Sequence, residues 1–230
     1  MKRQALVTLQ IGKSEFFESV NKNFQAVCKK HNWCFEIINK RAYKFLPVRK
    51  KLRRVQFEKF QVGELLKNYD RILYLDSDIL LREDLPDIFS LVPQDSVGCV
   101  MEDVGPLKWK RDEERLRAQK RLGQLSNWKE GYFNSGVFVV SKVHRGIFST
   151  RWSALAGGRW ADQTTLNYQV RAHGFSICSL PKEFNYHPEV CAKWQKVDCR
   201  RNAHIVHYAG PEAKKTMRED LKLLAQAKKP

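Results

Sequence analysis

The stretch of residues 69–81, Tyr-Asp-Arg-Ile-Leu-Tyr-Leu-Asp-Ser-Asp-Ile-Leu-Leu, constrains the fold more than any other part of the chain. Residues 72–75 are a short, continuous apolar run, which is typical of a strand buried on both faces of a sheet. Asp76 and Asp78 follow directly, and on extended backbone side chains at i and i+2 point to the same side. At the C-terminal end of a buried strand, that side opens onto the crevice where α/β sheets bind ligands.

Two carboxylates this close repel each other unless a cation lies between them. Hard oxygen ligands suit Mg²⁺ or Mn²⁺, so Asp76 and Asp78 are candidate metal ligands. The alternative is that Asp78 and later acids only cap the turn that follows the strand. An Asp-x-Asp after a strand has low specificity by itself, and the other motifs of the chain must decide between these interpretations.

Length and composition indicate one globular domain. A chain of 230 residues with 43% hydrophobic and 11% aromatic residues has ample material for one large core. No apolar run approaches the roughly 20 residues of a membrane-spanning helix, and the N-terminus lacks the apolar stretch of a signal peptide. The six cysteines include no C-x-x-C pair. They are predicted to be reduced, and the expected location is therefore cytoplasmic.

The charge is strongly positive, with 42 Lys and Arg against 25 Asp and Glu, a net charge of +17. Residues 40–54 hold eight basic side chains and no acid. A field of this sign attracts nucleic acid, anionic membranes or phosphate-bearing molecules. We favour contact with an anionic membrane or with a phosphorylated or acidic acceptor, or a role in solubility alone, over nucleic acid. Binding of nucleic acid would show steep salt dependence without metal.

The order of the predicted elements indicates an α/β fold with a mixed, mostly parallel central sheet flanked by helices. A strand at 5–8 is followed by a helix that Ser14 caps and whose inner face carries Phe17, Val20, Phe24 and Val27. Charged residues 106–122 are expected to form an exposed helix or a flap. The other predicted strands are 33–38, 97–101, 137–140, 175–180 and 204–210, and the other predicted helices are 52–66, a segment starting near 160, and 211–229.

Two polar segments adjoin these predicted elements. In Asn-Ser-Gly before the strand at 137–140, Gly136 allows a close approach of backbone or ligand, and Asn134 places an amide at the sheet edge. Asp162 stands at the start of the helix near 160 as an N-cap or a first-turn acid, and N-capping is the simplest explanation.

Four motifs in order carry a family resemblance: an apolar strand into Asp-x-Asp, then Phe-Asn-Ser-Gly-Val-Phe-Val-Val, then Asp-Gln-Thr-Thr-Leu-Asn, then His-Tyr-Ala-Gly-Pro with lysines following. Together they resemble the family 8 glycosyltransferases of GT-A fold, the group of glycogenin and the bacterial lipopolysaccharide galactosyltransferases. The short chain is also similar to compact transferases encoded by large DNA viruses. The resemblance implies one GT-A domain over residues 1–230, with a nucleotide-binding half at 1–101, an acceptor and catalytic half at 102–215, and a basic C-terminal helix at 211–230.

The resemblance also implies the site residues. Asp76, Asp78 and His207 would bind Mn²⁺ or Mg²⁺; His204 is the competitor of His207 and would face the opposite side of a strand. The positions implied to contact the reacting centre are Asn134, Asp162 and Gln163. The positions implied to contact the nucleotide-sugar donor are Thr8, Gln10, Lys59, Ser77, Gly210 and Lys214.

The chain departs from the family pattern in two places. Ala213 stands where the family has a lysine, so that Lys214 or Lys215 would have to reach the pyrophosphate. Residues 102–130, where acceptor contacts are expected, match the family poorly. The acceptor and the stereochemical outcome therefore stay open.

The expected reaction is transfer of a hexose from UDP-glucose or UDP-galactose to a hydroxyl of a glycan or glycoprotein. One alternative is an inverting transferase that uses a deoxyhexose donor such as UDP-rhamnose, with Asp162 or Asp103 as general base. A phosphatase of the haloacid dehalogenase type is disfavoured, because its Asp-x-Asp follows the first strand, whereas two predicted strands precede this one. A nucleic-acid-binding module without enzymatic activity is the third alternative.

Overall fold

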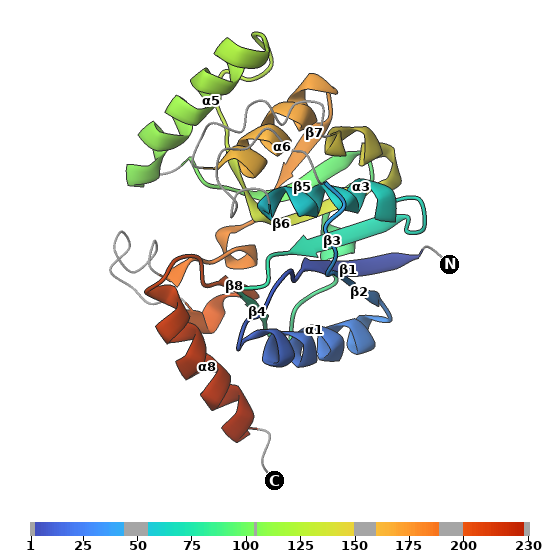
Figure 1. The fold of residues 1–230 in the computed structure, drawn as a ribbon, viewed down its shortest axis with the longest axis vertical. Helices are drawn as coiled ribbons and strands as arrows, with labels where there is room; N and C mark the ends of the chain where they lie inside the picture. The colour runs from blue at the N-terminus through green and yellow to red at the C-terminus, as the bar shows by residue number, and fades with distance from the viewer. Residues whose placement is uncertain (1–2, 44–54, 104, 150–159, 189–199, 228–230) are drawn as a thin grey trace.

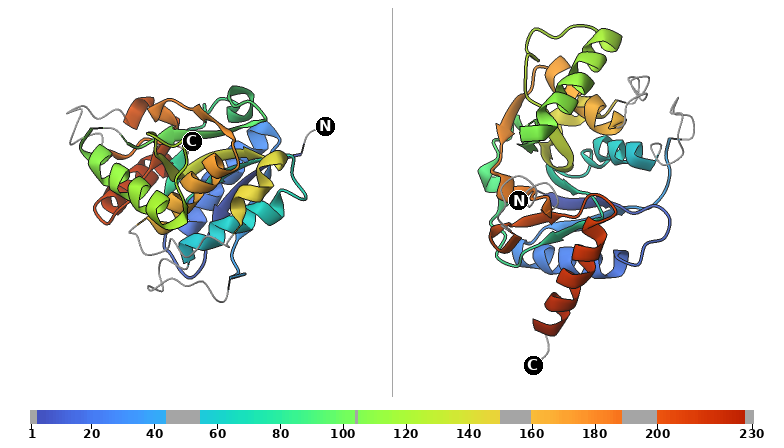
Figure 2. Two further views of the ribbon diagram at one scale, coloured as in Figure 1. Left: turned by 90° about the horizontal axis from the view of Figure 1, so that it is seen from above. Right: turned by 90° about the vertical axis from the view of Figure 1, so that its left-hand side faces the viewer.

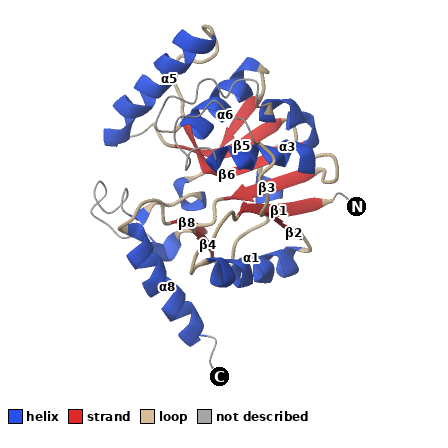
Figure 3. Cartoon of the chain, viewed as in Figure 1, coloured by secondary structure: helices blue, strands red, loops and turns tan. Residues whose placement is uncertain are grey.

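The computed structural model describes residues 3–43, 55–103, 105–149, 160–188 and 200–227. Most of the basic block 40–54 lies outside these ranges. The chain forms one mixed sheet with helices on both faces (Figure 1, Figure 3), which confirms the predicted fold class.

Six strands form the central sheet in the order β2-β1-β3-β6-β5-β7. β1 runs parallel to β2 and β3, β7 runs parallel to β5, and β6 is antiparallel to both of its neighbours. A separate pair, β4 with β8, is antiparallel and places Ile79 opposite His207. The strands are β1 (Gln4–Leu9), β2 (Cys34–Ile38), β3 (Arg71–Leu75), β4 (Ile79–Leu81), β5 (Ser96–Met101), β6 (Phe133–Ser141), β7 (Ser176–Ser179) and β8 (Ile205–His207).

Alternation along the buried strands divides the core between the two faces of the sheet. Leu73 and Leu75 of β3 pack on the face that α1 covers, whereas Ile72 and Tyr74 pack on the opposite face, against η1 and α6. In Figure 1 these layers lie below and above the sheet, and α8 projects from the body, as Figure 2 also shows. The longer helices are α1 (Phe17–His31), α5 (Lys108–Leu122), α6 (Ala161–Ala172) and α8 (Ala213–Ala227). The short ones are η1 (Phe57–Gln61), α3 (Val62–Leu65), α4 (Ile88–Leu91), η2 (Gly105–Leu107), η3 (Lys142–Phe148), η5 (Lys182–Phe184) and η6 (Arg200–Asn202).

The first helix begins later than predicted. α1 starts at Phe17, and Ser14 is not its N-cap; the Ser14 hydroxyl accepts a hydrogen bond from the backbone N–H of Phe16 before the helix begins. Phe16 is buried in place of Phe17, while Val20 and Phe24 face the core as predicted. The first core contact therefore comes from Phe16 in the turn before the helix, whereas the helical periodicity had predicted Phe17.

The helix predicted at 52–66 is irregular in its described part, where η1 interrupts it. The Glu58 carboxylate accepts a hydrogen bond from the backbone N–H of Ala42, and Lys59 contacts Asp162. Glu58 and Lys59 are thus adjacent buried charges with tertiary partners, and both lie in the 3-10 turn η1, which is tighter than an α-helical turn.

The charged segment 106–122 was expected to form either an exposed helix or a flap. Residues 108–122 form a helix, α5. Four of its residues are buried, and three of those are polar: Arg111, Glu114 and Gln119. None of the helices in the described ranges is long and apolar enough to cross a membrane. Cys28, Cys34, Cys99 and Cys178 are free thiols, as predicted; the remaining two cysteines lie outside the described residues.

Candidate active site

Asp76 and Asp78 lie where β3 ends, in the turn that leads to β4. The backbone N–H of Asp76 donates to the carbonyl of Gly136 at 2.8 Å, and the backbone carbonyl of Asp78 accepts from the N–H of Tyr208 at 2.8 Å. The two carboxylates therefore converge through a turn and not, as predicted, through extended backbone. Because β8 pairs with β4, His207 is brought next to Asp78 from the far end of the chain.

Asp76, Asp78 and His207 each offer one ligand atom, and these atoms all lie within 4.8 Å of one another. His207 Nε2 is 3.3 Å from Asp78 Oδ1. Asp76 Oδ1 accepts a hydrogen bond from the Tyr74 hydroxyl at 2.8 Å and faces Lys59, which leaves Oδ2 on the side of His207. Two carboxylates with an imidazole are a donor set that suits Mn²⁺, and the residues present fit such an ion.

Gly136 provides the space for this cluster. A Cβ at this position would lie 2.3 Å from His207 Cε1 and 2.9 Å from Asp76 Oδ2. Glycine therefore lets strand β6 approach the two candidate ligands, as the prediction of a close approach at Gly136 anticipated.

The orientation of the His207 ring is set by a neighbouring amide. His207 Nδ1 lies 3.0 Å from Asn185 Oδ1, which can only accept, so Nδ1 carries the proton and Nε2 faces Asp78. Burial alone would lower the pKa of His207, but the adjacent Asp78 carboxylate outweighs burial and raises it. His204, the alternative ligand, packs instead against the ring of Phe184 at 5.0 Å.

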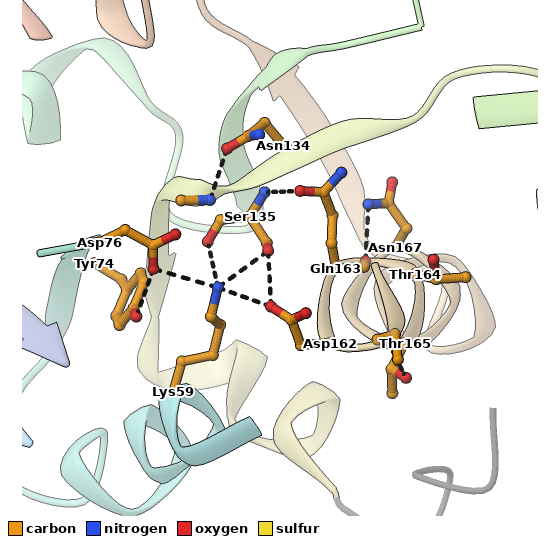
Figure 4. Close-up of polar contacts among 12 residues, drawn as sticks. Lys59, Tyr74, Asp76, Asn134, Ser135, Asp162, Gln163, Thr164, Thr165 and Asn167 are labelled. Atoms are coloured by element: carbon orange, nitrogen blue, oxygen red, sulfur yellow. Dashed lines mark hydrogen bonds and ion pairs between the residues drawn. The ribbon is translucent and has the colours of Figure 1, made fainter. Parts of the chain in front are cut away.

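Lys59 joins the cluster to the start of α6 (Figure 4). Its ammonium lies 2.9 Å from Asp162 Oδ2 and 3.3 Å from Asp76 Oδ1, and it donates to the carbonyl and hydroxyl oxygens of Ser135. Burial alone would lower the pKa of Lys59, but the two carboxylates raise it above its usual range, so the ammonium stays charged. Of the two roles predicted for Asp162, the N-cap is wrong, since the N-cap of α6 is Trp160, and the first-turn acid is confirmed. The Asp162 side chain forms the ion pair with Lys59.

Asn134 and Gln163, the two predicted carboxamides, lie near Asp162 and Ser135 (Figure 4). Gln163 Oε1 accepts from the backbone N–H of Ser135 at 3.1 Å, and Asn134 Oδ1 accepts from Gly136 at 2.8 Å. Both side chains are buried. The structure thus assembles Asn134, Asp162 and Gln163 around one segment of β6.

Sequence reasoning missed four residues of this site: Ser135, Asn185, Glu102 and Arg111. Glu102 directly follows β5 at the same sheet edge, so an acid after a buried strand was the available signal. Asp103, the alternative base, accepts a hydrogen bond from the backbone N–H of Gly131.

The roles of the remaining predicted donor contacts stay predictions. Thr8 is fully buried, and Gln10 at the end of β1 donates from its side-chain amide to Asn21 at 2.7 Å. Ser77 lies half-buried between the two aspartates. Gly210 has a φ of 106°, which suits glycine in the turn before α8, and Lys214 is exposed in the first turn of that helix.

The fold is that of the GT-A glycosyltransferases. Galactosyltransferase LgtC, solved with donor and acceptor sugar analogues, superposes with a TM-score of 0.62 over 90% of this chain and 87% of its own, at 18% identity. A glycosyltransferase involved in glycosylation of the major capsid of PBCV-1 gives a TM-score of 0.61 over 93% of this chain and 99% of its own, at 16% identity.

The family model for glycosyl transferase family 8 matches residues 5–215, and the chain belongs to that family. Lipopolysaccharide 1,2-glucosyltransferase of Escherichia coli K12 is 29% identical over 140 residues, and glucoside xylosyltransferase 1 of Gallus gallus is 25% identical over 146. The matches cover 58% and 55% of this chain but only 38% and 33% of those enzymes.

Proposed function

We propose that this glycosyltransferase moves a hexose from UDP-glucose or UDP-galactose to a sugar hydroxyl, with Mn²⁺ bound by Asp76, Asp78 and His207. The observation that carries the proposal is the convergence of these three side chains from β3 and β8 in the space left by Gly136. A divalent cation held there would stabilise the charge that develops on the departing diphosphate. The names of the curated relatives, both transferases with sugar-containing acceptors, support a carbohydrate acceptor.

The other residues of the site would bind and orient the donor sugar. Lys59 holds Asp162 and Asp76 in fixed positions, and Gln163 and Asn134 present polar groups beside them. Because the Asp162 carboxylate is buried and paired with Lys59, proton transfer to it would break an ion pair. We therefore propose retention of anomeric configuration, with Asp162 orienting the sugar and not acting as a general base.

The basic surface would attract an acidic partner. The exposed residues Lys214, Lys215 and Lys222 of α8 add to the charge of the chain, whereas Arg218 on the same helix pairs with Glu15 at 2.6 Å. We propose that they face an anionic membrane surface or a phosphorylated acceptor, since either would be drawn by the same field.

Isothermal titration of UDP, UDP-glucose, UDP-galactose and UDP-rhamnose, with Mn²⁺ and then with EDTA, tests the donor and the metal. We expect a UDP-hexose to bind in Mn²⁺ and to lose at least about tenfold in affinity in EDTA. Asp78→Asn should reproduce that loss in the presence of Mn²⁺, whereas Asp84→Asn, the same change at an exposed pair with Arg82, should not. If wild type binds neither UDP nor any UDP-sugar in Mn²⁺, the proposal is wrong. The anomeric configuration of the product, read by NMR, decides between retention and inversion.

A further inference from the structure

Glu102, which directly follows β5, accepts hydrogen bonds from two side chains of the site and forms an ion pair with a third. Asn134 Nδ2 donates to Oε1 at 3.2 Å, and Gln163 Nε2 donates to Oε2 at 2.8 Å. Arg111 Nη2 lies 2.8 Å from the same Oε2. The Glu102 side chain is 13% exposed, and none of the recognised motifs includes it.

These bonds give each carboxamide one orientation. An amide has an accepting oxygen and a donating nitrogen, and both nitrogens face Glu102. Both oxygens therefore face the backbone of β6, where they accept from the N–H groups of Gly136 and Ser135. A flipped Asn134 or Gln163 would set N–H against N–H at one end and oxygen against carboxylate at the other.

Arg111 ties Glu102 to helix α5. Its side chain is 3% exposed, and its guanidinium lies 3.9 Å from the centre of the Trp160 ring and 5.4 Å from that of Tyr132. Two aromatic rings and the Glu102 carboxylate together restrict the position of the planar guanidinium. Glu102 in turn keeps a cationic partner while it accepts from two amides.

We propose that Glu102 and Arg111 are a positioning pair that fixes the carboxamides of Gln163 and Asn134 for the donor sugar. The inference rests on the proposed function, because it assigns the two amides to the sugar end of the donor. The pair acts through these amides, whereas the diphosphate end depends on Asp76, Asp78 and His207. Loss of the pair should therefore lower sugar transfer and leave binding of UDP with Mn²⁺ nearly unchanged.

The test compares Glu102→Gln and Arg111→Met with matched controls on the exposed face of α5, Glu113→Gln and Arg121→Met. A glutamine at 102 adds an N–H₂ group where three donors already converge. We expect kcat to fall by about 10- to 100-fold in both site variants, as is common when a supporting partner is lost. The Kd of UDP in Mn²⁺ should change less than about threefold, and both controls should match wild type.

The proposal is overturned if the site variants keep the kcat of the controls. It is also overturned if UDP affinity falls as far as kcat, because the pair would then be a general structural brace. Side-chain amide exchange measured by NMR gives a readout that needs no turnover. The amide protons of Asn134 and Gln163 should exchange slowly in wild type and quickly in Glu102→Gln, and equal rates would refute the positioning role.

Failure of the proposed function can be distinguished experimentally from failure of the positioning role. Wild type would then bind no UDP-sugar, while the amide exchange measurement would still report whether Glu102 fixes the two carboxamides.

Discussion

Replacement of Lys59 by methionine tests a deeply buried charge of the site. The Lys59 side chain is 3% exposed, and it pairs with Asp162, which is 8% exposed, and with Asp76, which is 30% exposed. Methionine keeps most of the volume and removes the charge together with the bonds to Ser135. In the wild-type chain Asp76 and Asp162 share the Lys59 ammonium, and in the variant both carboxylates would lose this cationic partner.

The cost should be large because one of these carboxylates cannot reach water. Removing one partner of a buried ion pair typically costs about 3–5 kcal/mol. Asp76 is partly exposed and recovers some hydration, so most of the penalty comes from Asp162. For a chain of this length about 1 kcal/mol corresponds to roughly 2–4 °C, so Lys59→Met should lower the Tm by about 6–20 °C.

Urea unfolding in EDTA at neutral pH, followed by tryptophan fluorescence, measures this cost without a metal contribution. The double variant Lys59→Met with Asp162→Asn removes both charges, and we expect the two changes to couple by about 0.5–3 kcal/mol in the stabilising direction. Lys22→Met, at an exposed pair with Glu18, is the control and should stay within about 0.5 kcal/mol of wild type. A cost below about 1 kcal/mol for Lys59→Met, or strict additivity in the double variant, would refute the reasoning.

Two further predictions concern space and pH. Gly136→Ala should displace the His207 ring and Asp76, because its Cβ would fall 2.3 Å from His207 Cε1. Titration with Mn²⁺ should then show at least about tenfold weaker binding of the ion. An unchanged affinity would contradict the view that glycine is needed to make room for the two ligands. Burial lowers the pKa of His144, whose Nδ1 accepts the backbone N–H of Ser141 at 2.9 Å. The unfolded chain thus binds a proton at His144 more readily than the folded one, and the free energy of unfolding should fall as pH drops below about 6.5. His144→Gln, which can still accept from Ser141, should lose less stability between pH 7.5 and pH 5; an identical loss would show that other groups carry the acid sensitivity.

The central strand, the carboxylates that follow it and the order of the motifs could all be predicted from the local pattern of residues. Residues 72–75 are buried because a continuous apolar run has no polar face to expose, and β3 indeed lies inside the sheet with β1 and β6 on either side. Polar residues after the strand at 72–75 and before the strand predicted at 137–140 likewise placed Asp76, Asp78 and Asn134 at the sheet edge. Local periodicity and strand ends depend on residues that are neighbours in the chain, so they can be predicted from the sequence.

Which of these residues contact one another depends on the packing of elements that lie far apart in the chain. Asp162 at a helix start suggested a cap, and only the packing of η1 beside α6 shows that Lys59 binds it instead. Glu102 contacts Gln163 across 61 residues of sequence, and Lys59 contacts Ser135 across 76, because strand β6 lies between β3 and β5 in the sheet. The order of strands in a sheet follows from long-range pairing, which leaves no local period in the sequence. Helical and strand periodicity therefore predicts the elements that carry the site residues, and the long-range pairing of strands in the sheet brings those residues into contact.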